Sequence, residues 1–153
     1  MSALELKVPP PVVALVLALL MWLTPAVAGL VQIPYTARVL CAVALLCVGQ
    51  GISIAGMVAF RRAKTTVNPV KANMASSLVV QGVYRYTRNP MYVGLLVSLF
   101  AWAVFLANPL DVLWVVVYVL YITRFQIIPE ERVLAALFGP EYEGYKGRVR
   151  RWV

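Results

Sequence analysis

The chain has 153 residues, of which 62% are hydrophobic and 13% are charged, and its formal net charge is +8. A soluble domain of this size is about half apolar and about a quarter charged, so this composition excludes an ordinary soluble domain. It predicts an all-α membrane protein, because open strands cannot satisfy their backbone groups in lipid. The chain contains no histidine. A histidine-based metal site and a histidine general base are therefore excluded, and we expect no bound metal.

Four apolar blocks follow one another along the chain, and each approaches the length that a helix needs to cross a bilayer, about 20 residues. They cover residues 12–30, 39–60, 91–107 and 111–128. The sequence Asn108-Pro109-Leu110-Asp111 separates the last two blocks and is typical of a tight turn. We therefore expect one membrane domain over residues 1–153. It would contain two helical hairpins, a cytosolic loop at 61–90 and a cytosolic helical tail at 129–153.

The first block has an alternative interpretation as a secretion signal. Ala26-Val27-Ala28 follows an apolar stretch and matches the small-residue pattern of a cleavage site. The residues before the stretch include Glu5 and Lys7 rather than a positive patch, and Pro25 follows a long apolar run. We therefore expect the block to be retained as a span.

The charges are distributed unequally between the two sides of the predicted membrane domain. Basic residues concentrate in the loop and the tail, namely Arg61, Arg62, Lys64, Lys71, Arg85, Arg88, Arg132, Lys146, Arg148, Arg150 and Arg151. The other side carries only Arg38 and Asp111. The positive-inside rule places the loop and both termini in the cytosol. The basic residues flank spans and form no stripe with stacking aromatics, so we expect contact with membrane lipids and none with nucleic acid.

The second block carries small residues at helical spacing, Gly49, Ser53 and Gly56. Small side chains let two helices approach closely in lipid. Gln50 lies in the same stretch, and we expect it to hydrogen-bond to a neighbouring helix. Polar residues within a span also serve as ligand contacts, so a ligand role for Gln50 stays open.

The third block opens with a polar and aromatic group at residues 82–94, Gly-Val-Tyr-Arg-Tyr-Thr-Arg-Asn-Pro-Met-Tyr-Val-Gly. Asn89 is a favoured N-cap and Pro90 a favoured first helical residue, so the group would at least begin a helix. Gly94 falls one turn into that helix, and its missing side chain indicates a close neighbour.

Two further groups follow the fourth block. Pro129-Glu130-Glu131 suits the beginning of a new helix, because proline is favoured at the first position and acids interact well with the helix dipole. Residues 138–149, Phe-Gly-Pro-Glu-Tyr-Glu-Gly-Tyr-Lys-Gly-Arg-Val, predict an amphipathic tail on the membrane surface.

The order of these groups resembles the membrane methyltransferases, namely the isoprenylcysteine carboxyl methyltransferases and the related phospholipid N-methyltransferases. The likeness is to their short bacterial-type members and covers about residues 64–152. It implies an enzyme of the bacterial inner membrane that uses S-adenosylmethionine and releases S-adenosylhomocysteine. It also implies a set of cofactor-binding residues: Gly82, Val83, Tyr84, Arg88, Asn89, Pro90 and Tyr92 on one side, and Glu130 and Glu131 on the other. It assigns no catalytic residue.

These residue types suit the implied cofactor, which carries a sulfonium, an ammonium and a carboxylate. A glutamate can accept charge-assisted hydrogen bonds from the ammonium or from ribose hydroxyls, and Arg88 can pair with the carboxylate. The sulfonium is already activated, so catalysis can rest on alignment of the acceptor and exclusion of water.

Departures from the family pattern concern the methyl acceptor. Asn89 stands where many members have histidine, and Gln126 stands where a second arginine is usual. Arg124 would bind an anionic acceptor, or else snorkel to the interface. We expect a lipid-like or amphiphilic acceptor that enters from the membrane. Phospholipid nitrogen and a small thiol are the alternative acceptors, and a four-span transporter or scaffold is the non-enzymatic alternative.

Overall fold

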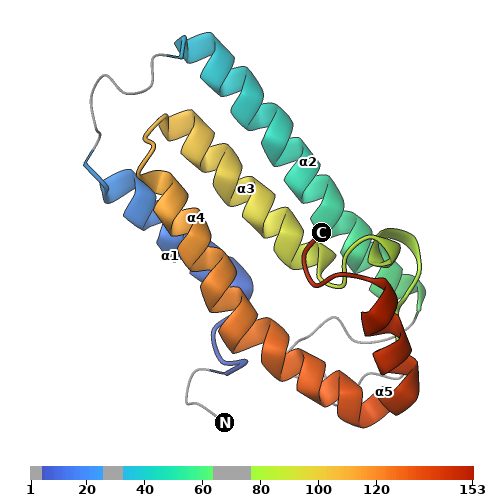
Figure 1. The fold of residues 1–153 in the computed structure, drawn as a ribbon. Helices are drawn as coiled ribbons and strands as arrows, with labels where there is room; N and C mark the ends of the chain where they lie inside the picture. The colour runs from blue at the N-terminus through green and yellow to red at the C-terminus, as the bar shows by residue number, and fades with distance from the viewer. Residues whose placement is uncertain (1–4, 26–32, 64–76) are drawn as a thin grey trace.

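The computed structural model describes residues 5–25, 33–63 and 77–153, and within these ranges it contains helices and connecting segments but no strand. The elements in chain order are α1 (Pro10–Leu23), α2 (Tyr35–Arg62), the 3₁₀ turn η2 (Gly82–Arg85), α3 (Pro90–Leu106), α4 (Asp111–Ile122), the π-helical turn η3 (Thr123–Ile127) and α5 (Ile128–Arg148). The predicted all-α class is confirmed for the described residues (Figure 1). The signal-like residues 26–28 and the basic residues Lys64 and Lys71 lie outside them.

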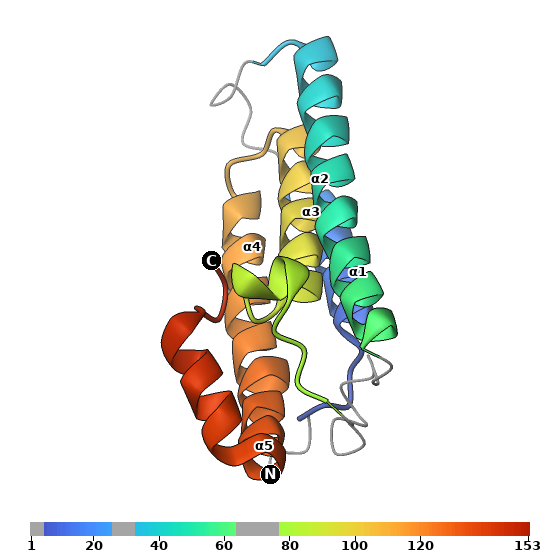
Figure 2. The same ribbon diagram turned by 90° about the vertical axis from the view of Figure 1, so that its right-hand side faces the viewer.

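Helix α3 is the centre of the bundle. Helix α2 packs along one side of it, while α1 and α4 pack on α3 from the other side and also on each other. Figure 2 shows α3 between α2 and α4, with α1 behind. The second predicted hairpin, α3 with α4, is present. The first predicted hairpin, α1 with α2, needs correction, because these two helices each pack on α3 rather than mainly on each other.

The close approach of α2 to α3 follows from the small residues that the sequence places there. A Cβ atom added to Gly49 would lie 2.7 Å from the Gly94 carbonyl oxygen, and one added to Gly94 would collide with Gly49 and Ser53. The Gln50 side-chain amide donates a hydrogen bond of 2.9 Å to the Ser98 hydroxyl. The predicted close neighbour of Gly94 and the predicted helix–helix bond of Gln50 are both confirmed.

The turn between α3 and α4 lies where it was predicted. Ala107 ends α3 in the left-handed region with φ 53°. The Asn108 side chain accepts from the Leu110 amide at 3.3 Å, and the Asn108 carbonyl accepts from the Asp111 amide at 3.0 Å. This Asx-type arrangement reverses the chain within four residues.

The prediction that Pro129 starts a separate helix is wrong. Helix α4 continues through η3 into the first part of α5 as one rod, up to the kink at Gly139, and this rod extends beyond the beginning of α3 in Figure 1. Proline has no N–H, so the carbonyl four residues earlier, on Phe125, loses its usual partner. The backbone widens into the π turn η3 immediately before this point. The Leu6 amide donates to the Phe125 carbonyl at 3.0 Å and thereby replaces the missing bond.

Two helical stretches among the described residues are long and apolar enough to cross a membrane, Tyr35–Arg62 and Asp111–Arg148, the second of which is kinked at Gly139. Helices α1 and α3 are apolar but contain only 14 and 17 residues. At about 1.5 Å per residue, 17 residues rise about 26 Å, against a hydrocarbon core of about 30 Å. Each predicted block thus contains a helix, but α1 ends at Leu23, where the first block was predicted to continue to residue 30, and two helical stretches reach spanning length.

Candidate functional site

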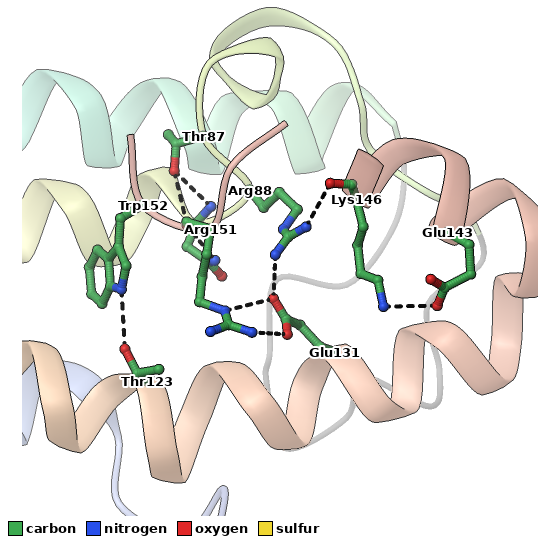
Figure 3. A network of polar contacts seen from close by, with 9 residues as sticks. Thr87, Arg88, Thr123, Glu131, Glu143, Lys146, Arg151 and Trp152 are labelled. Carbon is green, nitrogen blue, oxygen red and sulfur yellow. Dashed lines mark hydrogen bonds and ion pairs between the residues drawn. The ribbon is translucent and has the colours of Figure 1, made fainter. Parts of the chain in front are cut away.

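The predicted cofactor-binding groups meet at one end of the bundle. The turn η2, the beginning of α3 and the beginning of α5 converge there, and residues 149–152 run between them. Figure 3 shows Arg88 and Arg151 directed at Glu131 from the two chain segments that face α5.

Glu131 is held by two guanidinium groups. Arg88 donates from Nη2 to Oε1 at 2.8 Å. Arg151 donates from Nε to Oε1 at 3.0 Å and from Nη2 to Oε2 at 2.7 Å, which is the bidentate geometry that arginine favours with a carboxylate. The hydrogen bonds to Glu131 raise the pKa of Arg151 above its usual value. Both oxygens of Glu131 are therefore engaged.

Glu130 lies in a different environment from its neighbour. It accepts a short hydrogen bond from the Tyr92 hydroxyl on Oε1, and within the described ranges its second oxygen receives none. Burial of the carboxyl raises the pKa of Glu130 from 4.5 to about 7, although the Tyr92 bond opposes the shift. Glu130 is thus the carboxyl in this cluster that can gain or lose a proton near neutral pH.

The turn η2 places Tyr84 against this cluster. Gly82 begins the turn with φ +63°, a conformation that glycine adopts without strain. Tyr84 is buried, its ring contacts Phe60 edge-on, and its carbonyl accepts from the Tyr145 hydroxyl at 2.7 Å. Burial raises the pKa of Tyr84 well above its usual value and that of Tyr145 to about 12, so both hydroxyls stay neutral.

Asn89 and Pro90 begin α3 at the predicted positions. The Asn89 carbonyl accepts from the amides of Tyr92 and Val93, each at 3.0 Å, and Pro90 is buried at the first helical residue. The Asn89 side chain makes no cap. Its Nδ2 donates instead to the Arg151 carbonyl at 2.8 Å. The position of Asn89 before the first residue of α3 was predicted correctly, whereas the hydrogen bond of its side chain to Arg151 was not predicted.

Residues 149–152 were not among the predicted site residues. The Arg88 amide donates to the Arg150 carbonyl at 3.0 Å, and the Trp152 indole donates to the Thr123 hydroxyl at 3.1 Å. Gly139 makes this return possible, because its φ of 48° bends α5 back toward α3. The glycine and the arginine–tryptophan pair were visible in the sequence, but they indicated only a tail on the membrane surface.

Arg124, the predicted acceptor-binding residue, does not join the Glu131 cluster. It pairs with Glu5 at 2.9 Å, and Arg132 pairs with the same carboxylate at 3.0 Å. The Gln126 side chain next to it donates to the Val8 carbonyl at 2.6 Å. These residues attach the 5–8 segment to the joint between α4 and α5.

An apolar groove of about 400 Å³ opens between α2, α3 and α4. Its lining residues are Leu45, Leu96, Val97, Phe100, Val115, Val116, Val119 and Leu120. Leu96 lies one helical turn from Tyr92, and Val119 follows Tyr118, whose hydroxyl donates to the Tyr92 carbonyl at 3.3 Å. The groove therefore begins one turn from the polar cluster and leads away from it along the bundle.

Comparisons with known proteins identify the family of this chain. The phospholipid methyltransferase family model matches residues 37–141. An uncharacterized protein of Haemophilus influenzae is 48% identical over 63 residues, which are 41% of this chain and all of that protein. The protein-S-isoprenylcysteine O-methyltransferase of Schizosaccharomyces pombe is 31% identical over 111 residues, 71% of this chain and 46% of that one. A probable protein-S-isoprenylcysteine O-methyltransferase of Oryza sativa is 33% identical over 108 residues, 69% of this chain and 55% of that one.

The chain thus spans about half the length of these two named relatives. No solved structure matches it. The family model covers well over half of the chain, including both predicted site motifs. The resemblance inferred from the sequence is therefore confirmed, and this chain belongs to the phospholipid methyltransferase family, a family of methyltransferase enzymes.

Proposed function

We propose that this protein is an integral membrane methyltransferase that uses S-adenosylmethionine to methylate a lipid-like acceptor at the cytosolic face. The observation that carries the proposal is the meeting of the two family motifs in one cluster, through Arg88 with Glu131 and Tyr92 with Glu130, one turn from an apolar groove. The proposed topology keeps four spans in one domain over residues 1–153, with both termini in the cytosol of a bacterial cell.

The cluster offers complementary groups to the two ends of the cofactor's amino-acid moiety. The Nε of Arg88 is buried and has no hydrogen-bond partner in the part of the chain that the structure describes, so it suits a carboxylate. The second oxygen of Glu130 suits an ammonium or a ribose hydroxyl. Glu131 is shared by two arginines, and we assign it the role of orienting Arg88. Backbone groups of Gly82, Val83 and Tyr84 would lie along the cofactor, with Asn89 and Pro90 behind them.

Bound S-adenosylmethionine supplies an already activated methyl group, so the residues need mainly to align the acceptor and exclude water. Tyr84, Tyr92 and Pro90 are buried at the site and shield it. A carboxylate or thiolate acceptor needs no base. For an amine acceptor, Glu130 is the group suited to take the proton, because its pKa of about 7 lies near working pH.

The groove supports a lipid-like acceptor over a water-soluble one. An acyl or prenyl chain in the groove would direct its polar end to the cluster one turn away. The half-exposed Arg124 is our candidate for binding an anionic acceptor, as two of the named relatives are isoprenylcysteine O-methyltransferases. Phospholipid nitrogen is the second candidate, favoured by the family that the chain matches.

Cofactor binding is the first test. Calorimetry with S-adenosylhomocysteine would compare detergent-purified wild type with Arg88→Ala and Glu131→Ala. Arg148→Ala is the control, since Arg148 is exposed and, among the described residues, its side chain bonds within its own helix. We expect wild type and the control to bind, and each site variant to lose about 1–3 kcal/mol of binding free energy. Absence of binding by folded wild type would overturn the proposal.

The acceptor is tested separately by transfer of labelled methyl groups to a farnesylated cysteine, to phosphatidylethanolamine vesicles and to a soluble thiol. Base-labile label identifies a methyl ester and base-stable label an N-methyl or S-methyl product. Faster methylation of the soluble thiol than of either lipid would show that the groove is not the acceptor's route.

A further inference from the structure

The 149–152 segment lies beyond residue 141, where the family match stops, yet it contacts both matched motifs. We propose that this segment completes the cofactor site and that Arg151 is a positioning residue, which fixes Glu131 so that Arg88 faces the carboxylate of the methyl donor. This inference rests on the proposed function and names a residue that the resemblance did not.

The side chain of Arg151 sets the plane of the Glu131 carboxylate. Its two nitrogens bond to the two carboxylate oxygens, at 3.0 and 2.7 Å, and a fork of this kind fixes orientation as well as distance. Arg88 then bonds to one of these oxygens through Nη2 and to the Lys146 carbonyl through Nη1, at 2.8 and 3.3 Å. Both terminal nitrogens of the guanidinium are thus held, and the buried Nε is the nitrogen of Arg88 that has no hydrogen-bond partner among the described residues.

The backbone of the segment fixes the other motif. The Arg151 carbonyl accepts from the Asn89 side chain at 2.8 Å and from the Thr87 hydroxyl at 3.4 Å. The Arg150 carbonyl accepts from the Arg88 amide at 3.0 Å. One residue, Arg151, therefore contacts the beginning of α3 through its carbonyl and the beginning of α5 through its side chain, as Figure 3 shows.

The charges lead to the same assignment. Glu131 alone would neutralise Arg88 and leave it little attraction for an anion. The second guanidinium, on Arg151, shares that carboxylate, so the three groups together carry one surplus positive charge. A carboxylate ligand is the natural partner for such a surplus in a shielded site.

The test uses two probes that differ in the group at issue. S-adenosylhomocysteine carries the amino-acid carboxylate, whereas 5′-methylthioadenosine lacks the amino-acid moiety. We expect Arg151→Gln to weaken binding of S-adenosylhomocysteine about tenfold, the usual scale for a lost charge-assisted bond. The affinity for 5′-methylthioadenosine should stay within about twofold of the wild-type value, which corresponds to ~0.4 kcal/mol. Arg151→Lys, which keeps the charge but not the fork, should give an intermediate loss.

Arg150→Gln is the matched control, because Arg150 is the neighbouring exposed arginine and, within the described ranges, contacts the site through its carbonyl, which the substitution keeps. If Arg151→Gln binds S-adenosylhomocysteine as well as Arg150→Gln does, the inference is wrong while the proposed function stands. Equal weakening of both probes would mean a purely structural role and would also overturn it. If wild type binds neither probe, the proposed function itself fails. Should Arg151→Gln not fold, Arg151→Lys answers the same question.

Discussion

Two clusters of the described residues each place one glutamate between two arginines, and they differ in which members are buried. At the joint between α4 and α5, Glu5 is 3% exposed, while its partners Arg124 and Arg132 are 52% and 54% exposed. At the candidate site, Arg88 and Glu131 are 11% and 14% exposed. Water can replace a lost partner of an exposed arginine but cannot reach a buried one, so the same three charges serve attachment in one place and precise orientation in the other.

Glu131→Ala should have the largest effect. It leaves the buried Arg88 guanidinium without its carboxylate, so we expect the free energy of unfolding to fall by about 3 kcal/mol. Thermal unfolding in detergent measures this. Glu143→Ala removes an exposed pairing with Lys146 at 2.9 Å and should cost less than about 0.5 kcal/mol. Equal losses in these two variants would show that burial does not distinguish the pairs.

Glu130 differs from Glu5 and Glu131, because it is a buried acid that no arginine contacts within the described residues. Its pKa of about 7 exceeds the ordinary 4.5, so between these pH values the folded protein holds a proton that the unfolded chain has released. The stability of wild type should therefore fall as pH rises from about 4.5 to 7, by on the order of 2 kcal/mol. The free energies of unfolding of wild type and Glu130→Gln, measured across this pH range, test the prediction.

The control for that experiment is the variant itself, since Glu130→Gln has no proton to lose and should remove this contribution. Binding of S-adenosylhomocysteine should change in the opposite direction and strengthen as pH rises through 7, because the carboxylate form accepts hydrogen bonds from the ammonium. A pH profile that is identical in wild type and variant would assign the titration to another group.

Glu5→Ala should cost less than Glu131→Ala, about 1 kcal/mol, because it leaves Arg124 and Arg132 in contact with water. The affinity for S-adenosylhomocysteine should stay unchanged. A loss of affinity as large as that of Glu131→Ala would mean that the 5–8 segment positions the site as strongly as the 149–152 segment does.

Arg124→Ala should have the smallest effect on stability, below about 0.5 kcal/mol, because Arg132 still pairs with Glu5. It also tests the predicted acceptor role of Arg124. If Arg124 binds an anionic acceptor, the KM for that acceptor rises while the KM for the methyl donor stays constant. Unchanged values of both would leave Arg124 with a structural role only.

The features that the sequence predicted are those encoded by local patterns. The helical blocks, the turn at Asn108, the close neighbour of Gly94 and the bond of Gln50 all follow from residue type and spacing along one helix. The motif residues around Arg88 and Glu131 came from the resemblance to a family, and the structure brings them together. Their individual roles in cofactor binding stay predictions.

The features that the sequence did not predict depend on contacts between distant segments. Nothing near Pro129 indicated that Leu6 would take the hydrogen bond that this proline cannot make, and Glu5 and Arg124 are 119 positions apart. Arg151 was interpreted as one more basic residue beside the membrane, because a count of charges cannot distinguish an arginine that faces water from one that binds a buried carboxylate.

The bond between the Leu6 amide and the Phe125 carbonyl has a consequence for biosynthesis. Leu6 is made 119 residues before its acceptor on Phe125, and Glu5 is likewise made long before Arg124 and Arg132. The loop between such segments must close against chain entropy before the contact forms. The first three helices can thus insert and pair while the joint is still incomplete. A chain that ended before residue 124 would contain α1, α2 and α3 but would lack Arg124 and Arg132, the partners of Glu5, and the α5 residues of the candidate site.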